Sequence, residues 1–211
     1  MSLPPDHIRR DMVLTCQRLY ARGFIVGTEG NVSVRVAPDR LWITPTGYHK
    51  GWLRPEDLLL VDFEGHVYFG QGRPSSEMPM HLALYRCRPD IGAVVHAHPP
   101  LATALTVARY RLEAALLPEA VVLLGEVPTV PYELPTTAHF AQEIGAAMHH
   151  AQAALLENHG SVTVGATLQE AFNNLETVER LAQIFYLAKT LGQVHPLPPA
   201  AVEALQALRP A

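Results

Sequence analysis

The chain has 211 residues, of which 48% are hydrophobic, and a net charge of −4 at pH 7, which favours a single domain spanning residues 1–211 with a full apolar core. Because the charge is slightly negative and no basic cluster is present, we expect no nucleic-acid partner. No apolar run approaches the roughly 20 residues of a membrane span, and the N-terminus lacks the pattern of an export signal, so we expect a cytoplasmic protein without membrane contact.

The first third of the sequence predicts one helix followed by strands. Apolar side chains recur at helical spacing over residues 6–22, with Asp6 as the predicted N-cap and Gly23 as the stop. Residues 63–65 read as a hairpin turn between two extended segments. Four strands are predicted here: 31–36, 41–44, 58–62 and 66–69.

The rest of the chain alternates between helices and strands. Residues 77–87 have helical periodicity, with Ser75 or Ser76 as the predicted N-cap, and Thr167 and Glu170 form a capping box that opens the longest helix. Further strands are predicted at 92–98, 120–124, 127–130, 153–157 and 162–164. Further helices are predicted from Pro99-Pro100, at 137–148 and after 196–199. Strands grouped early, with helices mixed among them, predict a three-layer α/β/α domain with a mixed, mostly antiparallel sheet.

Three histidines at the ends of apolar strands carry the clearest chemical signal. His96 and His98 lie two residues apart on an extended segment, so both side chains point to the same face. His159 follows the apolar run 153–156 and precedes Gly160, where the backbone can bend sharply. Three neutral imidazoles suit a borderline cation such as zinc and leave a coordination position open for substrate. By spacing alone, the alternative of hydrogen-bonded structural histidines stays open.

Glu77 begins a predicted helix and allows two interpretations. As a first-turn acid it would favour the helix dipole, with His81 one turn on as a pairing or packing residue. Alternatively, the same helix N-terminus binds an anion through hydroxyl and free N–H groups. The polar turns at 27–31 and 44–47 offer further donors, and three such turns can bind a phosphate without Lys or Arg. Glu29 would repel an anion there, so we expect it to point away.

Five motifs follow one another over nearly the whole chain: Gly27–Arg35, Ile43–Gly47, Pro74–Glu77, Val94–Pro99 and Asn158–Gly160. In this order and spacing they resemble the class II aldolase/adducin-head family, most closely its bacterial L-fuculose-1-phosphate aldolase branch. The resemblance implies one zinc ion per subunit, bound by His96, His98 and His159, with Glu77 as fourth ligand and acid/base. It also implies a set of residues that hold the substrate phosphate: Thr28, Asn31, Thr46, Gly47, Ser75 and Ser76.

The resemblance further implies a reaction. A zinc-dependent aldolase of this kind reversibly cleaves a ketose 1-phosphate, such as L-fuculose 1-phosphate, into dihydroxyacetone phosphate and an aldehyde. The metal would stabilise the charge of the enediolate as a Lewis acid, and Glu77, displaced by substrate, would return a proton. The family resemblance also implies a homotetramer with active sites at the subunit interfaces.

Two departures from the branch concern the aldehyde side of the reaction. Leu117 occupies the register of a tyrosine that donates a proton across the subunit interface, and no tyrosine follows Tyr186 in the C-terminal tail. A methylthioribulose-1-phosphate dehydratase and a sugar-acid phosphate decarboxylase therefore stay open. A sugar-phosphate epimerase is disfavoured because that branch has Asp in place of Glu77. A non-enzymatic adducin-like binding module is disfavoured because the three histidines are retained.

Overall fold

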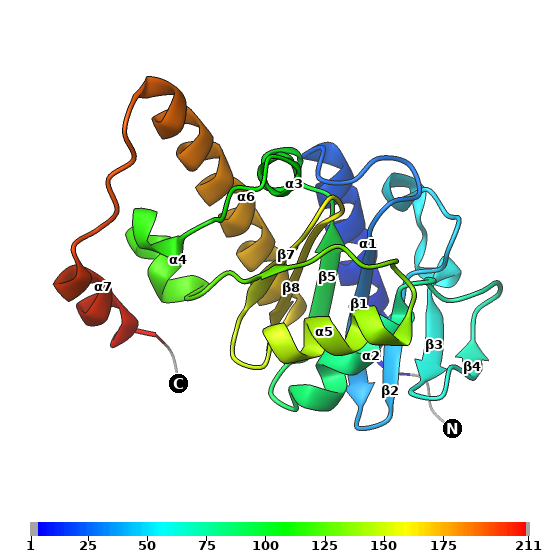
Figure 1. Cartoon of the computed structure of the whole chain (residues 1–211). Coiled ribbons are helices and arrows are strands. Elements are labelled where there is room, and N and C mark those ends of the chain that lie inside the picture. Colours follow the sequence, from blue (N-terminus) through cyan, green and yellow to red (C-terminus); the bar gives the residue numbers. More distant parts are fainter. Residues whose placement is uncertain (1–3, 210–211) are drawn as a thin grey trace.

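One eight-stranded sheet runs through the molecule (Figure 1). The computed structural model describes residues 4–209. Its strands are β1 (Asn31–Ala37), β2 (Arg40–Ile43), β3 (Leu59–Asp62), β4 (Val67–Phe69), β5 (Ala93–Ala97), β6 (Thr129–Val130), β7 (Ala153–Leu156) and β8 (Gly160–Gly165). They lie in the order β4-β3-β2-β1-β5-β8-β7-β6, and every neighbouring pair is antiparallel except β6 with β7. The predicted mixed, mostly antiparallel sheet is confirmed.

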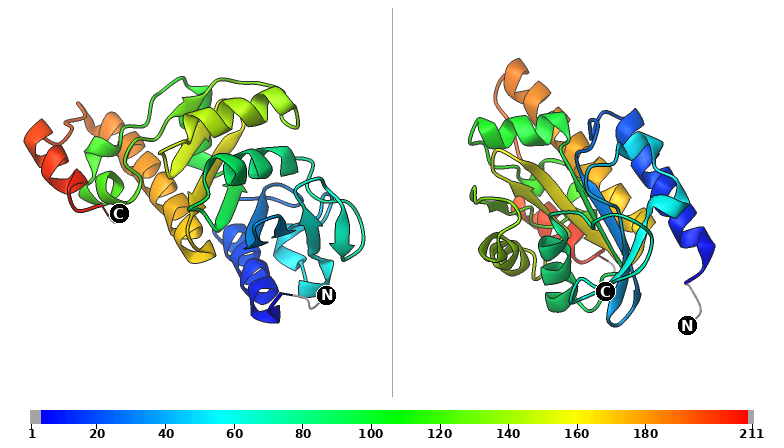
Figure 2. Two further views of the ribbon diagram at one scale, coloured as in Figure 1. Left: turned by 90° about the horizontal axis from the view of Figure 1, so that it is seen from below. Right: turned by 90° about the vertical axis from the view of Figure 1, so that its right-hand side faces the viewer.

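Helices cover both faces of this sheet, which gives the three layers seen edge-on in Figure 2. One face carries α2 (Met78–Cys87) and α5 (Ala138–Ala147), and the other carries α1 (Asp6–Ala21), α3 (Pro100–Val107) and α6 (Leu168–Leu191). The remaining helical segments are η1 (Lys50–Trp52), η2 (Pro55–Asp57), η3 (Ala114–Leu116), α4 (Pro118–Leu123) and α7 (Pro199–Gln206). Within residues 4–209, no helix has the length and apolarity needed to cross a membrane.

Alternation along the strands divides the core into two sides. On β2, Leu41 and Ile43 join the buried cluster beneath α2 and α5, whereas Trp42 between them joins the cluster beneath α1. On β5, Val94 faces the α2 side and Val95 the α1 side. Because successive strand side chains point to opposite faces, an apolar run can be buried on both.

The predicted strand at 120–124 is wrong, because these residues belong to α4 and the residue after it. Apolar residues without a clear period do not distinguish a short buried strand from a helix. Pro118 decides the matter, since its fixed φ suits the first helical turn. The strand predicted at 127–130 shrinks to the two residues of β6, because Pro128 and Pro131 flank it and neither can donate a ladder hydrogen bond.

Two helix starts differ from the predictions. Asp6 is the first residue of α1 rather than its N-cap, a position that Pro5 occupies. Glu77, and neither Ser75 nor Ser76, is the N-cap residue of α2. The Ser75 hydroxyl instead accepts a hydrogen bond from the Glu77 N–H at 3.2 Å, just before the helix. Both differences follow from where the backbone turns, which residue preference alone does not fix.

Candidate active site

The sheet brings the three predicted histidines together. His96 lies within β5, His98 directly follows that strand, and His159 lies in the turn between β7 and β8. Because β5 pairs with β8, the end of the first strand meets the turn before the second. The three ring centroids lie 4.8 to 5.0 Å apart, and one ring nitrogen from each lies within 4.8 Å of the others.

Two residues of the β7–β8 turn place His159. Asn158 has a φ of 55°, a left-handed conformation that Asn tolerates better than most residues, and its N–H donates to the Thr106 hydroxyl at 3.1 Å. At Gly160 a Cβ atom would lie 2.5 Å from the Ala97 carbonyl oxygen and 2.7 Å from Cδ2 of His98. The absence of a side chain at Gly160 therefore permits the close approach that joins the ligand-bearing segments.

Glu77 faces this cluster from the N-terminus of α2. One carboxylate oxygen, Oε2, lies 3.3 Å from Nε2 of His96, and the other, Oε1, lies 3.3 Å from Nε2 of His159. The Asn31 amide donates to Oε2 at 2.8 Å. The half-buried carboxylate is therefore held beside two imidazoles by a neutral donor.

The hydrogen bonds of the cluster fit a metal centre. His96 Nδ1 donates to the Ser161 carbonyl at 2.9 Å, because a carbonyl can only accept, so a neutral ring directs its Nε2 lone pair at the cluster. Metal-bound histidines commonly fix their other ring nitrogen in this way. Within residues 4–209, no hydrogen bond reaches the buried atoms Oε1 of Glu77 and Nδ1 of His159. Three imidazoles and a carboxylate are a donor set that zinc accepts.

The electrostatics of the cluster favour ligands in their deprotonated forms. Burial, and then the neighbouring His96, lowers the pKa of His98 to about 3 and that of His159 to about 4. Burial alone would raise the pKa of Glu77, but His96, His159 and the Asn31 amide hold it well below its usual range. Burial also opposes protonation of His96, yet the Glu77 carboxylate raises the pKa of that ring. Metal ligands must be deprotonated, and three of these four groups are biased that way.

The three polar turns predicted to bind phosphate are linked by backbone hydrogen bonds. The Lys50 N–H donates to the Gly27 carbonyl at 2.9 Å, which ties the first turn to η1, the segment just after the second turn. The Ser75 N–H donates to the Thr44 carbonyl at 3.2 Å, which ties the second turn to the third. Three of the predicted residues are exposed: Thr28, Gly47 and Ser76. Thr46 is half-buried, and Ser75 is buried.

Asn31, also predicted to hold phosphate, is buried and bonded elsewhere. Its amide nitrogen donates to Glu77, and its amide oxygen faces His81. Glu29, expected to point away from an anion, is exposed and accepts a hydrogen bond from the backbone of its own turn at 3.1 Å. The same carboxylate lies 3.5 Å from Nδ1 of His98, so it reaches toward the histidines as well.

Lys50 is a feature of the site that sequence reasoning missed. Its side chain is 2% exposed, and Nζ donates to the carbonyl oxygens of Thr28 at 2.9 Å and Tyr48 at 3.0 Å. Burial lowers the pKa of Lys50, while the charge of Glu77 opposes that shift. A buried lysine thus joins the first turn to the residue that follows the second, in addition to the hydroxyl and backbone donors predicted there. Its position three residues after Gly47 was the available signal.

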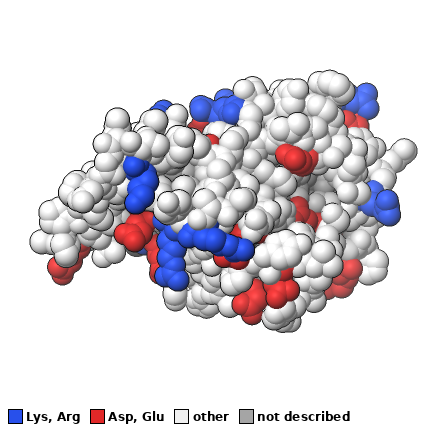
Figure 3. Space-filling model, turned by 45° about the horizontal axis from the view of Figure 1, so that its top comes forward, with Lys and Arg blue, Asp and Glu red and all other residues white. Residues whose placement is uncertain are grey.

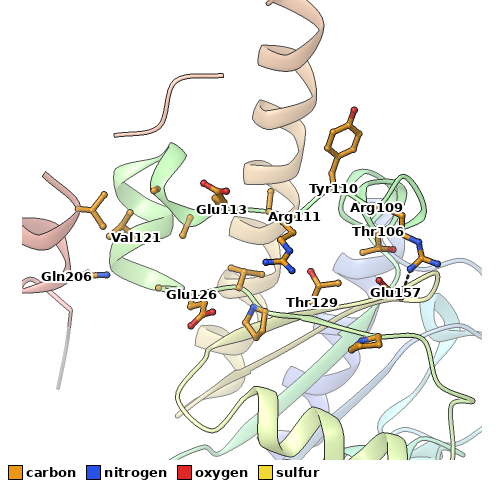
Figure 4. A pocket seen from close by; sticks show the side chains of 18 residues that line it. Thr106, Arg109, Tyr110, Arg111, Glu113, Val121, Glu126, Thr129, Glu157 and Gln206 are labelled. Carbon is orange, nitrogen blue, oxygen red and sulfur yellow. Dashed lines mark ion pairs between the residues drawn. The ribbon is translucent and has the colours of Figure 1, made fainter. Parts of the chain in front are cut away.

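The predicted aldehyde-side position is apolar, and a separate cavity lies near it. Leu117 is half-buried and packs against the cluster that includes α3 and α6. A cavity of about 820 Å³ is lined by Tyr110, the paired Arg109 and Glu157, and Arg111, whose guanidinium points into it (Figure 4). Of the described site residues discussed above, no histidine of the cluster lines this cavity.

Charged side chains on the surface do not form a field of one sign. On the face shown in Figure 3, basic and acidic residues are interspersed over a mostly uncharged surface. This face therefore lacks the continuous basic patch that binds nucleic-acid backbones.

Comparison with known sequences identifies similar proteins. Residues 10–186 match the class II aldolase and adducin N-terminal domain. The chain is 34% identical over 183 residues to an L-fuculose phosphate aldolase of Methanococcus maripaludis, an alignment that covers 87% of this chain and 98% of the relative. It is 36% identical over 184 residues to a 3-oxo-tetronate 4-phosphate decarboxylase of Escherichia coli, covering 85% and 86% of the two chains.

Solved structures share the fold at similar identity. An L-fuculose 1-phosphate aldolase superposes with a TM-score of 0.90 at 31% identity and covers 97% of each chain. The Escherichia coli protein YgbL, described as an aldolase, epimerase or decarboxylase, superposes with a TM-score of 0.87 at 34% identity, covering 95% of this chain and 98% of its own. The similar proteins therefore have the same fold but differ in named reaction.

Proposed function

The chain belongs to the class II aldolase and adducin N-terminal domain family, and from this membership we propose that it is a zinc-dependent aldolase. The proposed reaction is the reversible cleavage of a ketose 1-phosphate, such as L-fuculose 1-phosphate, to dihydroxyacetone phosphate and an aldehyde. The observation that carries the proposal is the cluster of His96, His98 and His159 with the Glu77 carboxylate 3.3 Å from two of the rings.

In this proposal the three histidines hold one zinc ion and Glu77 is the fourth ligand of the resting site. Two observations support that assignment: the Nδ1 hydrogen bond of His96, and a Glu77 Oε1 that accepts no hydrogen bond from the described residues. When bound, zinc supplies a Lewis acid that stabilises the negative charge released as the carbon–carbon bond breaks. Zinc analysis of the purified protein should give one ion per chain, and His96→Ala should lose it. Metal-free protein with an unchanged fold would contradict the assignment.

The protein's own residues supply binding and proton transfer. Glu77 would leave the cluster when substrate binds. In the cleavage direction it would give a proton to the carbon that keeps the electron pair of the broken bond, which completes dihydroxyacetone phosphate, and in the reverse direction it would take that proton back. The phosphate is held by backbone N–H groups and hydroxyls of the three turns, with Thr28, Thr46, Gly47, Ser75 and Ser76 as the proposed residues. The Asn31 side chain is not among them, because it is buried and already bonded to Glu77 and His81. Exposure of three of these positions at the turn surfaces supports access for a phosphate.

Decarboxylation of a sugar-acid phosphate is the second candidate. It is favoured by the 36% identity to a 3-oxo-tetronate 4-phosphate decarboxylase and by an apolar Leu117 in the tyrosine register of the aldolase branch. Loss of carbon dioxide leaves a similar negative charge on carbon. The same metal would stabilise that charge, and Glu77 would protonate the carbon. No aldehyde has to be protonated in that reaction, so an apolar residue at position 117 does not impair it.

For either reaction we propose a homotetramer with active sites at the subunit interfaces. Each chain forms one domain over residues 1–211. Large apolar side chains that the single chain leaves exposed support an assembly. Examples are Trp52, 74% exposed beside the phosphate turns, and Leu191, 89% exposed at the end of α6. Burial of such surface is the main driving force of association.

A substrate panel tests the proposed reaction. The protein is incubated with dihydroxyacetone phosphate and a set of aldehydes, and separately with 3-oxo-tetronate 4-phosphate. Formation of ketose phosphates supports the aldolase. Release of carbon dioxide from the acid, with no product from any aldehyde, would replace it by the decarboxylase. Glu77→Gln should abolish exchange of the carbon-bound proton of dihydroxyacetone phosphate while its binding persists, and unchanged exchange would remove Glu77 from the proton-transfer role.

A further inference from the structure

Polar side chains form matching rows on one face of β1 and along α2. Asn31 and Ser33 are two residues apart on one face of β1, whereas Glu77, His81 and Tyr85 are four residues apart along α2. Two strand residues advance about 6.6 Å, and four helix residues advance about 6 Å. The spacing of the polar side chains is therefore nearly the same on both elements, so that each polar group on the helix contacts one on the strand.

Hydrogen bonds join these groups into one chain deep in the core. Tyr85 Oη lies 2.9 Å from Ser33 Oγ, which lies 2.6 Å from His81 Nδ1. His81 Nε2 contacts Asn31 Oδ1, and Asn31 Nδ2 lies 2.8 Å from Glu77 Oε2. Four of the five residues are at most 4% exposed, so water cannot replace these bonds. We call Tyr85, Ser33, His81 and Asn31, in this order, the Asn31 chain.

The donors in the Asn31 chain all point toward Glu77. An ionised carboxylate only accepts, so the Asn31 amide must direct its NH2 group at Glu77 and its oxygen at His81. His81 Nε2 must then carry the proton that it donates to that oxygen. Burial keeps His81 neutral by lowering its pKa to about 3, so Nδ1 accepts from the Ser33 hydroxyl. Ser33, having donated its proton, accepts from Tyr85.

We propose that the Asn31 chain is a positioning device for Glu77, in which His81 fixes the orientation of the Asn31 amide. An Asn amide can rotate by half a turn at little cost, and the rotated amide would present its oxygen to the carboxylate. The Nε2–H of His81 prevents this rotation, because it would then face an NH2 group. Glu77 Oε2 is thereby held in one direction beside His96, while Oε1 is left for His159 and the proposed metal. His81 touches neither group and is a positioning residue.

A purely structural role would need none of this polarity. Apolar side chains of similar size would also join β1 to α2, and a buried network of hydrogen bonds stabilises a fold no better than good apolar packing. The Asn31 chain instead ends on the Glu77 carboxylate of the candidate site, and every one of its hydrogen bonds has a fixed donor and acceptor. The inference rests on the proposed role of Glu77, whereas the direction of the hydrogen bonds can be tested without it.

The test compares His81→Gln with His81→Leu. A Gln amide can donate to Asn31 and accept from Ser33, whereas Leu has similar bulk and does neither. The readouts are proton exchange of dihydroxyacetone phosphate, bound zinc and the unfolding midpoint of each variant. We expect His81→Leu to lower kcat for exchange or the affinity for zinc roughly 10- to 100-fold, with little change in KM, and His81→Gln to recover most of the loss. Equal losses in both variants, or full activity of His81→Leu, would overturn the proposal.

A second measurement uses the wild-type protein alone. Nitrogen NMR of labelled histidine should show His81 as a neutral ring with the proton on Nε2, and a ring protonated on Nδ1 would reverse the chain and overturn the proposal. If wild type shows no exchange at all, the aldolase assignment fails while this result still decides the Asn31 chain. Should His81→Leu fail to fold, Ser33→Ala removes the hydrogen bond to His81 Nδ1 with a smaller change. We expect Ser33→Ala to lower proton exchange or zinc affinity, and wild-type values of both would contradict the inference.

Discussion

At the residue scale, His81 and Gly160 show how much one position contributes to the site. His81 follows Glu77 by one helical turn, a spacing that predicts a pairing or packing residue, and the structure shows it bonded to Asn31 and Ser33 instead. Gly160 is predicted as a bend, and the structure adds that its lack of a Cβ lets β8 approach Ala97. In both cases the residue type was readable from the sequence and the partner was not.

We expect His81 to make the protein sensitive to acid. Burial, with a smaller contribution from His96 and against the opposing Glu77, lowers its pKa from 6.5 to about 3. Between these values the unfolded chain binds a proton that the folded protein does not, so stability is present above pH 6.5 and falls as the pH drops. The slope from one such group is at most about 1.4 kcal/mol per pH unit. Urea unfolding from about pH 7 to about pH 5 should show a larger loss for wild type than for His81→Gln, and parallel curves would contradict this.

Gly160→Ala should weaken both the fold and metal binding. The added Cβ would lie 2.5 Å from a backbone oxygen of β5 and 2.7 Å from the His98 ring, so the strand or the ring must move. Overpacking of this kind costs about 1–3 kcal/mol. Gly145→Ala in α5 is the control, since the nearest atoms to its Cβ lie 3.8 Å away and Ala favours a helix. Thermal unfolding and zinc titration should separate the two variants. A Gly160→Ala protein as stable and as tight for zinc as Gly145→Ala would argue against this role.

At the element scale, short polar turns and apolar runs were the hardest segments to predict. The turns at 27–31 and 44–47 are proposed as phosphate donors, and their attachment through Lys50 depends on η1, which follows the second turn. The run at 120–124 was predicted as a strand and is helical, because Pro118 starts α4. The long helix α6 was easier: Thr167 accepts from the Glu170 N–H as predicted, although the Glu170 carboxylate accepts from Ala166 instead.

Lys50→Met should loosen the phosphate turns and weaken anion binding. The substitution keeps the apolar stem but removes the ammonium that donates to the carbonyls of Thr28 and Tyr48. Hydrogen bonds from a charged donor contribute about 1.5–3 kcal/mol, so a roughly 10-fold lower affinity for inorganic phosphate is expected by calorimetric titration. Lys189→Met is the matched control, because that lysine is exposed on α6. Equal phosphate affinity in both variants would show that Lys50 does not serve the site.

At the scale of the whole molecule, one sheet places the candidate site near its centre and leaves apolar surface at its margins. His96 and Asn31 are register partners on the central strands β5 and β1. The C-terminal half of α6 and the helix α7 extend beyond the sheet (Figure 1). Tyr186, Leu187 and Leu191 are exposed on that half of α6. Exposed apolar side chains gathered on one element support the proposed assembly.

Light scattering of the purified protein should therefore give a mass about four times the 23.2 kDa of the chain. Because the proposed active sites lie at subunit interfaces, the specific activity should fall on dilution at the concentration where the particle dissociates. Leu191→Glu places a charge on an apolar side chain that is 89% exposed, and it is expected to move dissociation to higher protein concentration. A chain that is monomeric and fully active at all concentrations would contradict the tetramer.

The sequence by itself determined the family, the three-layer fold and the grouping of His96, His98 and His159, because motif order, strand alternation and strand ends are local properties. Only the tertiary structure decided that Asn31 contacts Glu77, which lies 46 residues away, and His81, which lies 50 residues away. It also decided that Lys50 is buried. Those contacts depend on how α2 and η1 pack against the rest of the chain, and periodicity within one element carries no information about its packing partner.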